Sequence, residues 1–209
     1  MKLILLGPPG AGKGTLAVKA VDILKAPHVS TGAIFRSAIA AKTPLGLKVK
    51  EIIGTGNLVD DETTIKVIKE RLAQNDVQNG YILDGFPRTI CQAGALENIS
   101  IVDRVVNFDA PDSIVLQRLG GRRVCRKCGF NFHVIFNKPQ KEGLCDHCGG
   151  ELFTRDDDQR QVIEQRLQIY RVQTAPLIDF YRGKGVLAYV DARPQADEVI
   201  NNFKKCLGL

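Results

Sequence analysis

The chain has 209 residues, of which 44% are hydrophobic and 25% are charged, and its formal net charge at pH 7 is +6. This length and apolar content suffice for a buried core, so a disordered chain is not expected. The positive charge favours anionic partners, and by itself it fits nucleotides, nucleic acids and anionic membranes about equally well. No run of about 18 apolar residues occurs, which argues against a transmembrane helix.

The first residues predict a strand, a glycine-rich loop and a helix in direct succession. Residues 3–6 are apolar, residues 7–15 read Gly-Pro-Pro-Gly-Ala-Gly-Lys-Gly-Thr, and residues 16–24 have helical apolar spacing. The apolar run is too short for the core of a signal peptide, so we expect a cytoplasmic protein. A strand, a glycine loop and a helix in this order are typical of the opening of a nucleotide-binding α/β domain.

The rest of the chain alternates between helical patterns and short apolar runs. Runs at residues 81–86 and 105–109 end in polar residues and predict central parallel strands, and residues 186–190 predict the last strand. Further helices are predicted over residues 33–41, 48–53, 62–72, 112–119, 159–181 and 196–207. The pattern therefore predicts an α/β fold, a parallel sheet flanked by helices on a P-loop type of core.

The glycine-rich loop predicts a phosphate site. Gly7, Gly12 and Lys13 have the spacing at which backbone N–H groups are exposed to phosphate oxygens, while the next helix points its positive end at the same anion. Lys13 would then reach the terminal phosphates. The hydroxyl residue expected directly after the lysine is replaced by Gly14, and Thr15 follows one place later, which weakens the case for metal binding by that hydroxyl.

Residues 121–158 interrupt the α/β rhythm with two C-x2-C pairs, formed by Cys125, Cys128, Cys145 and Cys148. In a reducing compartment this spacing predicts a structural Zn²⁺ site rather than disulfides. A segment this short has too little core to fold alone, so the metal would stabilise it. His133 or His147 could replace one cysteine, and iron or cobalt remain alternatives to zinc.

Five ordered motifs make the chain resemble adenylate kinases. They are the loop at residues 7–15, Ser-Thr-Gly at 30–32 with Arg36, Leu-Asp-Gly-Phe-Pro-Arg-Thr at 83–89, Gly-Arg-Arg-Val-Cys at 121–125 and Arg-x-Asp-Asp at 155–158. The resemblance implies reversible transfer of the terminal phosphoryl group of MgATP to AMP, giving two ADP. It also implies three parts: a core (1–29, 60–120 and 159–209), a helical AMP-binding insertion (30–59) and a lid (121–158).

The resemblance also implies the roles of individual residues. Lys13, Arg88, Arg118, Arg122, Arg155 and Arg166 would surround the phosphates, and Asp84 would hold Mg²⁺, with a helix N-cap as its structural alternative. ATP would contact Gly10, Ala11, Gly12, Lys13, Gly14, Thr15, Arg118, Arg122, Asn131, Phe132 and Arg193. AMP would contact Thr31, Arg36, Asn57, Leu58, Val59, Gly85, Phe86, Pro87, Arg88, Gln92, Arg155 and Arg166, with Gln92 facing the adenine edge.

Phosphoryl transfer needs cations, alignment and exclusion of water more than covalent help. A lid hinged at Gly120–Gly121 and at residues 156–158 would exclude water by closing only over both substrates. Because the AMP phosphate is already an oxyanion, no dedicated general base is expected. A monomer is the family expectation.

The chain departs from the family pattern at three positions. Ala33 stands where Asp is common, Asn57 where Lys is frequent and Leu16 where Gln is frequent. The first change removes a carboxylate near the expected magnesium shell, which predicts weaker metal binding or a lower rate. None of the three removes a phosphate ligand.

Two rival functions fit part of the sequence. A kinase for UMP, CMP or GMP would share the loop and the arginines, but the long cysteine-bearing lid and Gln92 favour the adenylate type. A zinc-ribbon nucleic-acid-binding protein would explain the positive charge and the paired cysteines. Aromatic residues for base stacking are sparse, since the chain has no Trp.

Overall fold

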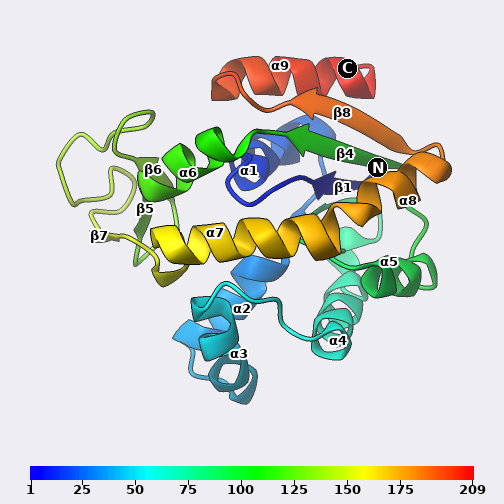
Figure 1. Ribbon diagram of the computed structural model, residues 1–209, viewed down its shortest axis with the longest axis horizontal. Coiled ribbons are helices and arrows are strands. Elements are labelled where there is room, and N and C mark those ends of the chain that lie inside the picture. Colours follow the sequence, from blue (N-terminus) through cyan, green and yellow to red (C-terminus); the bar gives the residue numbers. More distant parts are fainter.

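A computed structural model describes residues 1–209, with a five-stranded parallel sheet at its centre (Figure 1). The sheet order is β2-β3-β1-β4-β8, and all four neighbouring pairs run parallel. The strands are β1 (Lys2–Leu6), β2 (His28–Ser30), β3 (Tyr81–Asp84), β4 (Arg104–Asp109) and β8 (Leu187–Asp191). The predicted α/β class with a parallel sheet is confirmed.

Helices cover both faces of this sheet, which explains why its strands are continuous apolar runs. Leu3 and Leu5 of β1 face a core shared with α1 (Lys13–Leu24), α6 (Asp112–Gly120), α7 (Arg160–Ile169) and α9 (Ala196–Leu207). Ile4 and Leu6 face the opposite core, shared with α4 (Asp61–Leu72), α5 (Ile90–Glu97) and α8 (Pro176–Gly183). Alternate residues of one strand thus belong to the two cores.

The predicted helix over residues 159–181 is interrupted. After α7 comes a π-helical segment, Tyr170–Thr174, in which the N–H of Ala175 donates to the carbonyl of Tyr170 at 2.8 Å. Pro176 then opens α8, where its missing N–H costs no helical hydrogen bond. The predicted helical span is thus confirmed apart from the turn at Ala175, and only the π-helical segment was not predicted, because periodicity does not reveal an added residue in a turn.

The segment predicted as the helical insertion, residues 30–59, contains α2 (Thr31–Ala40) and α3 (Pro44–Gly54) and extends from the lower side of the sheet in Figure 1. Both helices begin at a hydroxyl cap, because Ser30 accepts from the N–H of Ala33 and Thr43 from that of Gly46. The insertion has its own apolar core of Phe35, Val49 and Val59.

The segment predicted as the lid, residues 121–158, lies at the left end of Figure 1, where α6 ends and α7 begins. Its antiparallel sheet has the order β6-β5-β7, with β5 (Arg122–Cys125), β6 (Asn131–His133) and β7 (Leu152–Phe153). Only Cys125, Phe132 and Cys145 form its buried cluster. Two short 3-10 turns complete the chain, Asn75–Val77 and Asp156–Asp158, and no helix is long and apolar enough to span a membrane.

Candidate functional site

The glycine-rich loop joins β1 to the first turn of α1, as predicted. Gly7, Gly10 and Gly12 all have positive φ, and a Cβ on Gly7 would lie 2.5 Å from the carbonyl oxygen of Phe108. Glycine is therefore required for both the backbone conformation and the close approach. Gly12 precedes the helix without any side-chain cap, which leaves the N-terminal N–H groups of α1 for an anion.

The amine of Lys13 is folded back over this loop. Its Nζ donates to the carbonyls of Gly7 and Pro8, at 2.7 Å each. Burial lowers the pKa of Lys13 to about 8, and the charges of Arg88 and Arg166 act in the same direction against the opposing charge of Asp84. A partly desolvated ammonium group therefore lies beside the N-terminus of α1, where a bound phosphate would stabilise its charge.

Asp84 ends β3 next to the loop, and its partner His28 is a residue that the sequence patterns did not single out. Nε2 of His28 lies 3.3 Å from Oδ2 of Asp84. Burial alone would raise the pKa of Asp84, but the His28 hydrogen bond and the charge of Lys13 prevail and lower it. A Cβ on Gly14 would lie 3.3 Å from the same oxygen, so a larger residue after Lys13 would crowd this carboxylate.

An ionised carboxylate beside a phosphate loop is a chemically suitable partner for Mg²⁺. Asp84 is not a helix cap, since α5 is capped by Thr89 and α1 has no side-chain cap. The donor set near the loop thus fits the magnesium role better than the N-cap alternative.

Arginines from the lid and from α7 converge on two buried aspartates. Nε of Arg155 donates to Asp157 at 2.7 Å, and Nε of Arg122 donates to Asp158 at 2.7 Å. Arg166 donates to the carbonyl of Asp157 at 2.7 Å and lies 3.4 Å from an oxygen of Asp158. The carboxylates hold these guanidinium forks in one place, as phosphate oxygens would.

The residues that flank the lid are packed rather than open. Asp157 and Asp158 are buried, and a Cβ on Gly121 would lie 2.4 Å from the ring of His133. These residues are thus packed in this conformation, and their role as hinges stays a prediction. Sequence reasoning missed the role of the two aspartates, because a short acidic run is usually solvated.

A pocket lies between the helical insertion, the end of β3 and the arginines. Gly85, with φ of 82°, turns the chain there, and its carbonyl accepts from Oγ1 of Thr31 and Nε of Arg88, at 2.9 Å each. The pocket is lined by Thr31, Gly32, Phe35, Arg36, Ile53, Gly56, Asn57, Leu58, Val59, Thr64, Gly85, Arg88, Gln92, Arg155, Asp157 and Arg166. Of the predicted AMP contacts, only Phe86 and Pro87 are absent from this lining.

Burial and mutual repulsion act on the arginine cluster. Burial, with the charges of Arg122 and Arg155, lowers the pKa of Arg166 to about 10, although Asp157 and Asp158 oppose the shift. The site therefore holds more positive charge than its carboxylates balance, which favours an anionic ligand.

Of the four remaining predicted ATP contacts, Arg118 and Arg193 lie near the loop, and Asn131 and Phe132 lie on β6. Arg118 donates to the carbonyl of Pro194 at 2.9 Å and to that of Ala11 at 3.4 Å. Arg193 is exposed and bonds Asp191, and Asn131 is exposed on β6. The ring of Phe132 is buried in the lid core, so it is not available for stacking on a base in this conformation.

The cysteine cluster has the geometry of a closed metal site. The four thiol sulfurs lie within 4.8 Å of one another, with 3.4 Å between Cys125 and Cys148 and 3.5 Å between Cys128 and Cys145. Tetrahedral zinc with Zn–S bonds of about 2.3 Å needs sulfurs about 3.8 Å apart, so these residues fit the ion. The N–H of Cys128 is the main group that lowers the pKa of Cys125, to about 6.

Neither histidine of the lid completes this set. Nδ1 of His133 accepts from the N–H groups of Ile135 and Phe136, at 3.0 and 3.1 Å, and Nε2 lies 3.2 Å from the carbonyl of Gln117. His147 packs on Phe130, with 3.9 Å between ring centroids. The alternative in which His133 replaces a cysteine is therefore wrong, and His147 does not belong to the cluster of four thiols.

The phosphate loop lies on a parallel sheet, and converging arginines and a second pocket at the strand ends face it. This arrangement defines a P-loop phosphotransferase that brings two anionic substrates together.

The adenylate kinase family model matches residues 5–186. Proteins named adenylate kinase match nearly full length. The one from Treponema denticola is 54% identical over 98% of both chains, and that from Caldicellulosiruptor bescii is 46% identical over all of both.

The adenylate kinase of Geobacillus sp. (strain WCH70) is also 46% identical, over 100% of this chain and 99% of its own. The chain belongs to the adenylate kinase family, and it is a nucleoside monophosphate kinase that uses ATP and AMP.

Proposed function

We propose that the phosphate loop holds the donor ATP, that the pocket under the helical insertion holds AMP, and that the arginine cluster holds the phosphates between them. The observation that carries this assignment is the pocket itself, in which Arg36 and Arg88 face Arg155 and Arg166 beside a buried amide, Gln92. The predicted parts (core 1–29, 60–120 and 159–209, insertion 30–59, lid 121–158) belong to the same proposal.

The chemistry asked of these residues is mainly electrostatic. Charge spreads over the equatorial oxygens of the transferred group, and Lys13 with the guanidinium forks of Arg122, Arg155 and Arg166 would stabilise it. Exchange of the Asp157 and Asp158 carboxylates for phosphate oxygens would need no new orientation of these arginines. The attacking oxygen of AMP is already anionic, so no side chain has to remove a proton.

Mg²⁺ bound with ATP would bridge its phosphates and neutralise developing charge. Asp84, ionised and next to Lys13, would hold that ion, and the hydrogen bond to His28 keeps its carboxylate in place. Ala33 provides no second carboxylate here. The position of the ion would therefore depend on the single carboxylate of Asp84.

The lid would exclude water while both nucleotides are bound. Arg122 and Arg155 belong to the lid, and both are tied to aspartates at its junction with α7. Movement of the lid therefore moves phosphate ligands. We assign Zn²⁺ as the structural metal of Cys125, Cys128, Cys145 and Cys148, over iron or cobalt, and we propose a cytoplasmic monomer.

An acceptor panel tests this function. Purified protein with MgATP is offered AMP, CMP, UMP, GMP or water, and diphosphate formation is followed over time. We expect AMP to exceed every other acceptor, and Lys13→Met or Arg88→Ala to lower kcat by about 10²–10³-fold. Lys19→Met on the same helix and Arg182→Ala, both exposed, are the matched controls. Preference for another monophosphate would overturn the acceptor, and no reaction with any would overturn the enzyme.

A further inference from the structure

The side-chain amide of Gln92 is held from both sides inside the pocket. Its Oε1 accepts from the backbone N–H of Arg88 at 2.8 Å, and its Nε2 donates to Oδ1 of Asp61 at 2.7 Å. The side chain is only 1% exposed. A buried amide with both ends bonded has one orientation, because a flip would set donor against donor and acceptor against acceptor.

Asp61 is itself fixed between two helices. Oγ1 of Thr89 lies 3.0 Å from both carboxylate oxygens, and the same hydroxyl accepts from the N–H of Gln92 at 3.1 Å as the cap of α5. Asp61 is not the cap of α4, since its neighbour Asp60 serves there by accepting from Thr63 at 2.8 Å. The carboxylate of Asp61 thus has no helix-capping role, and as an acceptor-only group it selects the Nε2 side of the amide.

The orientation of this amide decides which base edge it can read. Each end of Gln92 retains one bonding position, an N–H on Nε2 and a lone pair on Oε1. A 6-amino purine offers an acceptor at N1 and a donor at N6, which match that pair. A 6-oxo purine offers a donor at N1 and an acceptor at O6, so it would match only a flipped amide.

We propose that Asp61 is a positioning residue that sets the preference of the acceptor site for 6-amino over 6-oxo purines, by fixing the amide of Gln92 in one direction. The inference rests on the proposed function of this pocket as the AMP site. It adds a residue from α4 that acts on the base preference through Gln92.

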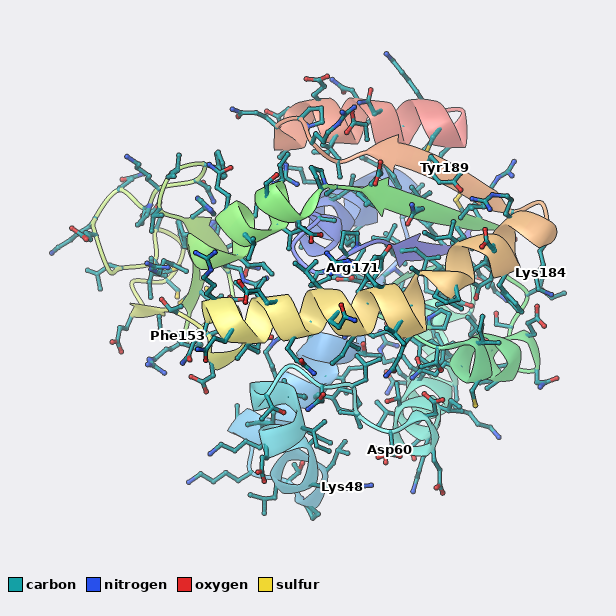
Figure 2. The ribbon with its side chains drawn as sticks, viewed as in Figure 1. Lys48, Asp60, Phe153, Arg171, Lys184 and Tyr189 are labelled. Atoms are coloured by element: carbon teal, nitrogen blue, oxygen red, sulfur yellow. The ribbon has the colours of Figure 1, made fainter.

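The test compares Asp61→Asn with Asp60→Asn, using AMP and IMP as acceptors and MgATP as donor. Asparagine at 61 supports either orientation of Gln92, so only the Arg88 N–H would still oppose the flip. Asp60→Asn removes the same charge at the same helix start and keeps a good cap; Figure 2 labels Asp60 and its ion-pair partner Lys48 below the sheet. IMP presents the 6-oxo edge without the 2-amino group of GMP.

We expect Asp61→Asn to lower the ratio of kcat/KM for AMP to that for IMP by about tenfold, while Asp60→Asn leaves the ratio unchanged. A purely structural role would lower both rates and keep the ratio, which would overturn the proposal. If the wild-type protein itself does not prefer AMP, the proposed function fails first, and the two failures are thereby distinguished.

A second measurement needs no variant at position 61. In ¹⁵N spectra of the wild-type protein, with the Gln92 side-chain amide assigned by Gln92→Glu, we expect one amide proton to be shifted downfield and protected from exchange with water. Two equivalent, rapidly exchanging protons would contradict the hydrogen bond to Asp61 and the proposal with it.

Discussion

The helical insertion and the lid are both small parts at the edges of one core, but different interactions hold them together. The insertion buries Phe35, Val49 and Val59 and packs α2 directly on α3. The apolar cluster of the lid contains a single phenyl ring, that of Phe132, and otherwise consists of Cys125 and Cys145 of its thiol cluster. A short segment is thus stabilised by apolar packing in one case and by a metal-binding cluster in the other.

The largest effect is expected from a substitution that disrupts the lid and leaves the insertion intact. Cys145→Ser removes a buried ligand, so we expect bound zinc to fall from one per chain to nearly none. Because Arg122 and Arg155 then lose their support, phosphoryl transfer to AMP should fall about tenfold or more. Metal analysis with steady-state kinetics checks this, and Cys206→Ser outside the cluster is the control. Full activity without metal would contradict the structural role.

The next largest effect is expected from a substitution that disrupts the packing of the insertion and leaves the lid intact. A Cβ on Gly46 would lie 2.0 Å from the carbonyl oxygen of Ala38, so Gly46→Ala should force α2 and α3 apart at a cost of about 1–3 kcal/mol. KM for AMP should rise, while zinc content and KM for ATP stay unchanged. Gly54→Ala on the same helix meets nothing within 4 Å and is the matched control. Equal stability of both variants would refute the packing argument.

A smaller effect, on zinc affinity, is expected from a substitution that crowds one thiol of the metal site. A Cβ on Gly150 would approach Sγ of Cys125 to 2.9 Å, so Gly150→Ala should weaken zinc binding by about tenfold. Gly120→Ala, which meets no atom within 4 Å, should leave the affinity unchanged. Competition with a chromophoric chelator measures both. An unaltered affinity in Gly150→Ala would mean that the thiols tolerate displacement.

The smallest effect concerns pH. Burial is the main cause that lowers the pKa of His133 below its ordinary value of about 6.5, helped by the charges of Arg123 and Arg118. The unfolded chain then binds this proton more readily, so the stability that His133 contributes is complete above about pH 6.5 and is lost as pH falls below it. At saturating zinc, the melting temperature should fall less steeply between pH 7 and pH 5.5 in His133→Gln than in the wild-type protein. An equal dependence of the melting temperature on pH in both proteins would contradict the contribution of His133 to stability.

Local patterns in the sequence were enough to predict much of the fold. The glycine loop, the buried strands and the thiol spacing each lie within a few residues, and α9 begins and ends at the predicted residues. β2 was missed because three residues carry no periodicity, and α5 because its short span includes Gly94. Such elements are set by their neighbours in the fold rather than by their own pattern.

The parts of the site that were missed are contacts between distant segments. Asp61 and Gln92 lie 31 positions apart, and His28 and Asp84 lie 56 apart, so no spacing rule joins them. The contact of Phe132 with the nucleotide stays a prediction, and its ring fills the lid core in this conformation. Arg122 was expected from a motif, but its partner Asp158, 36 positions away, could be identified only in the folded chain.

Hydrogen exchange on the full protein, with zinc and after chelation, tests the difference between the two small parts most directly. Phe153 in β7 and Lys48 in α3, both labelled in Figure 2, fall in peptides that report on the lid and the insertion. We predict that chelation speeds exchange across residues 121–158 and leaves residues 30–59 unchanged. Equal acceleration of both parts, or of neither, would contradict the account.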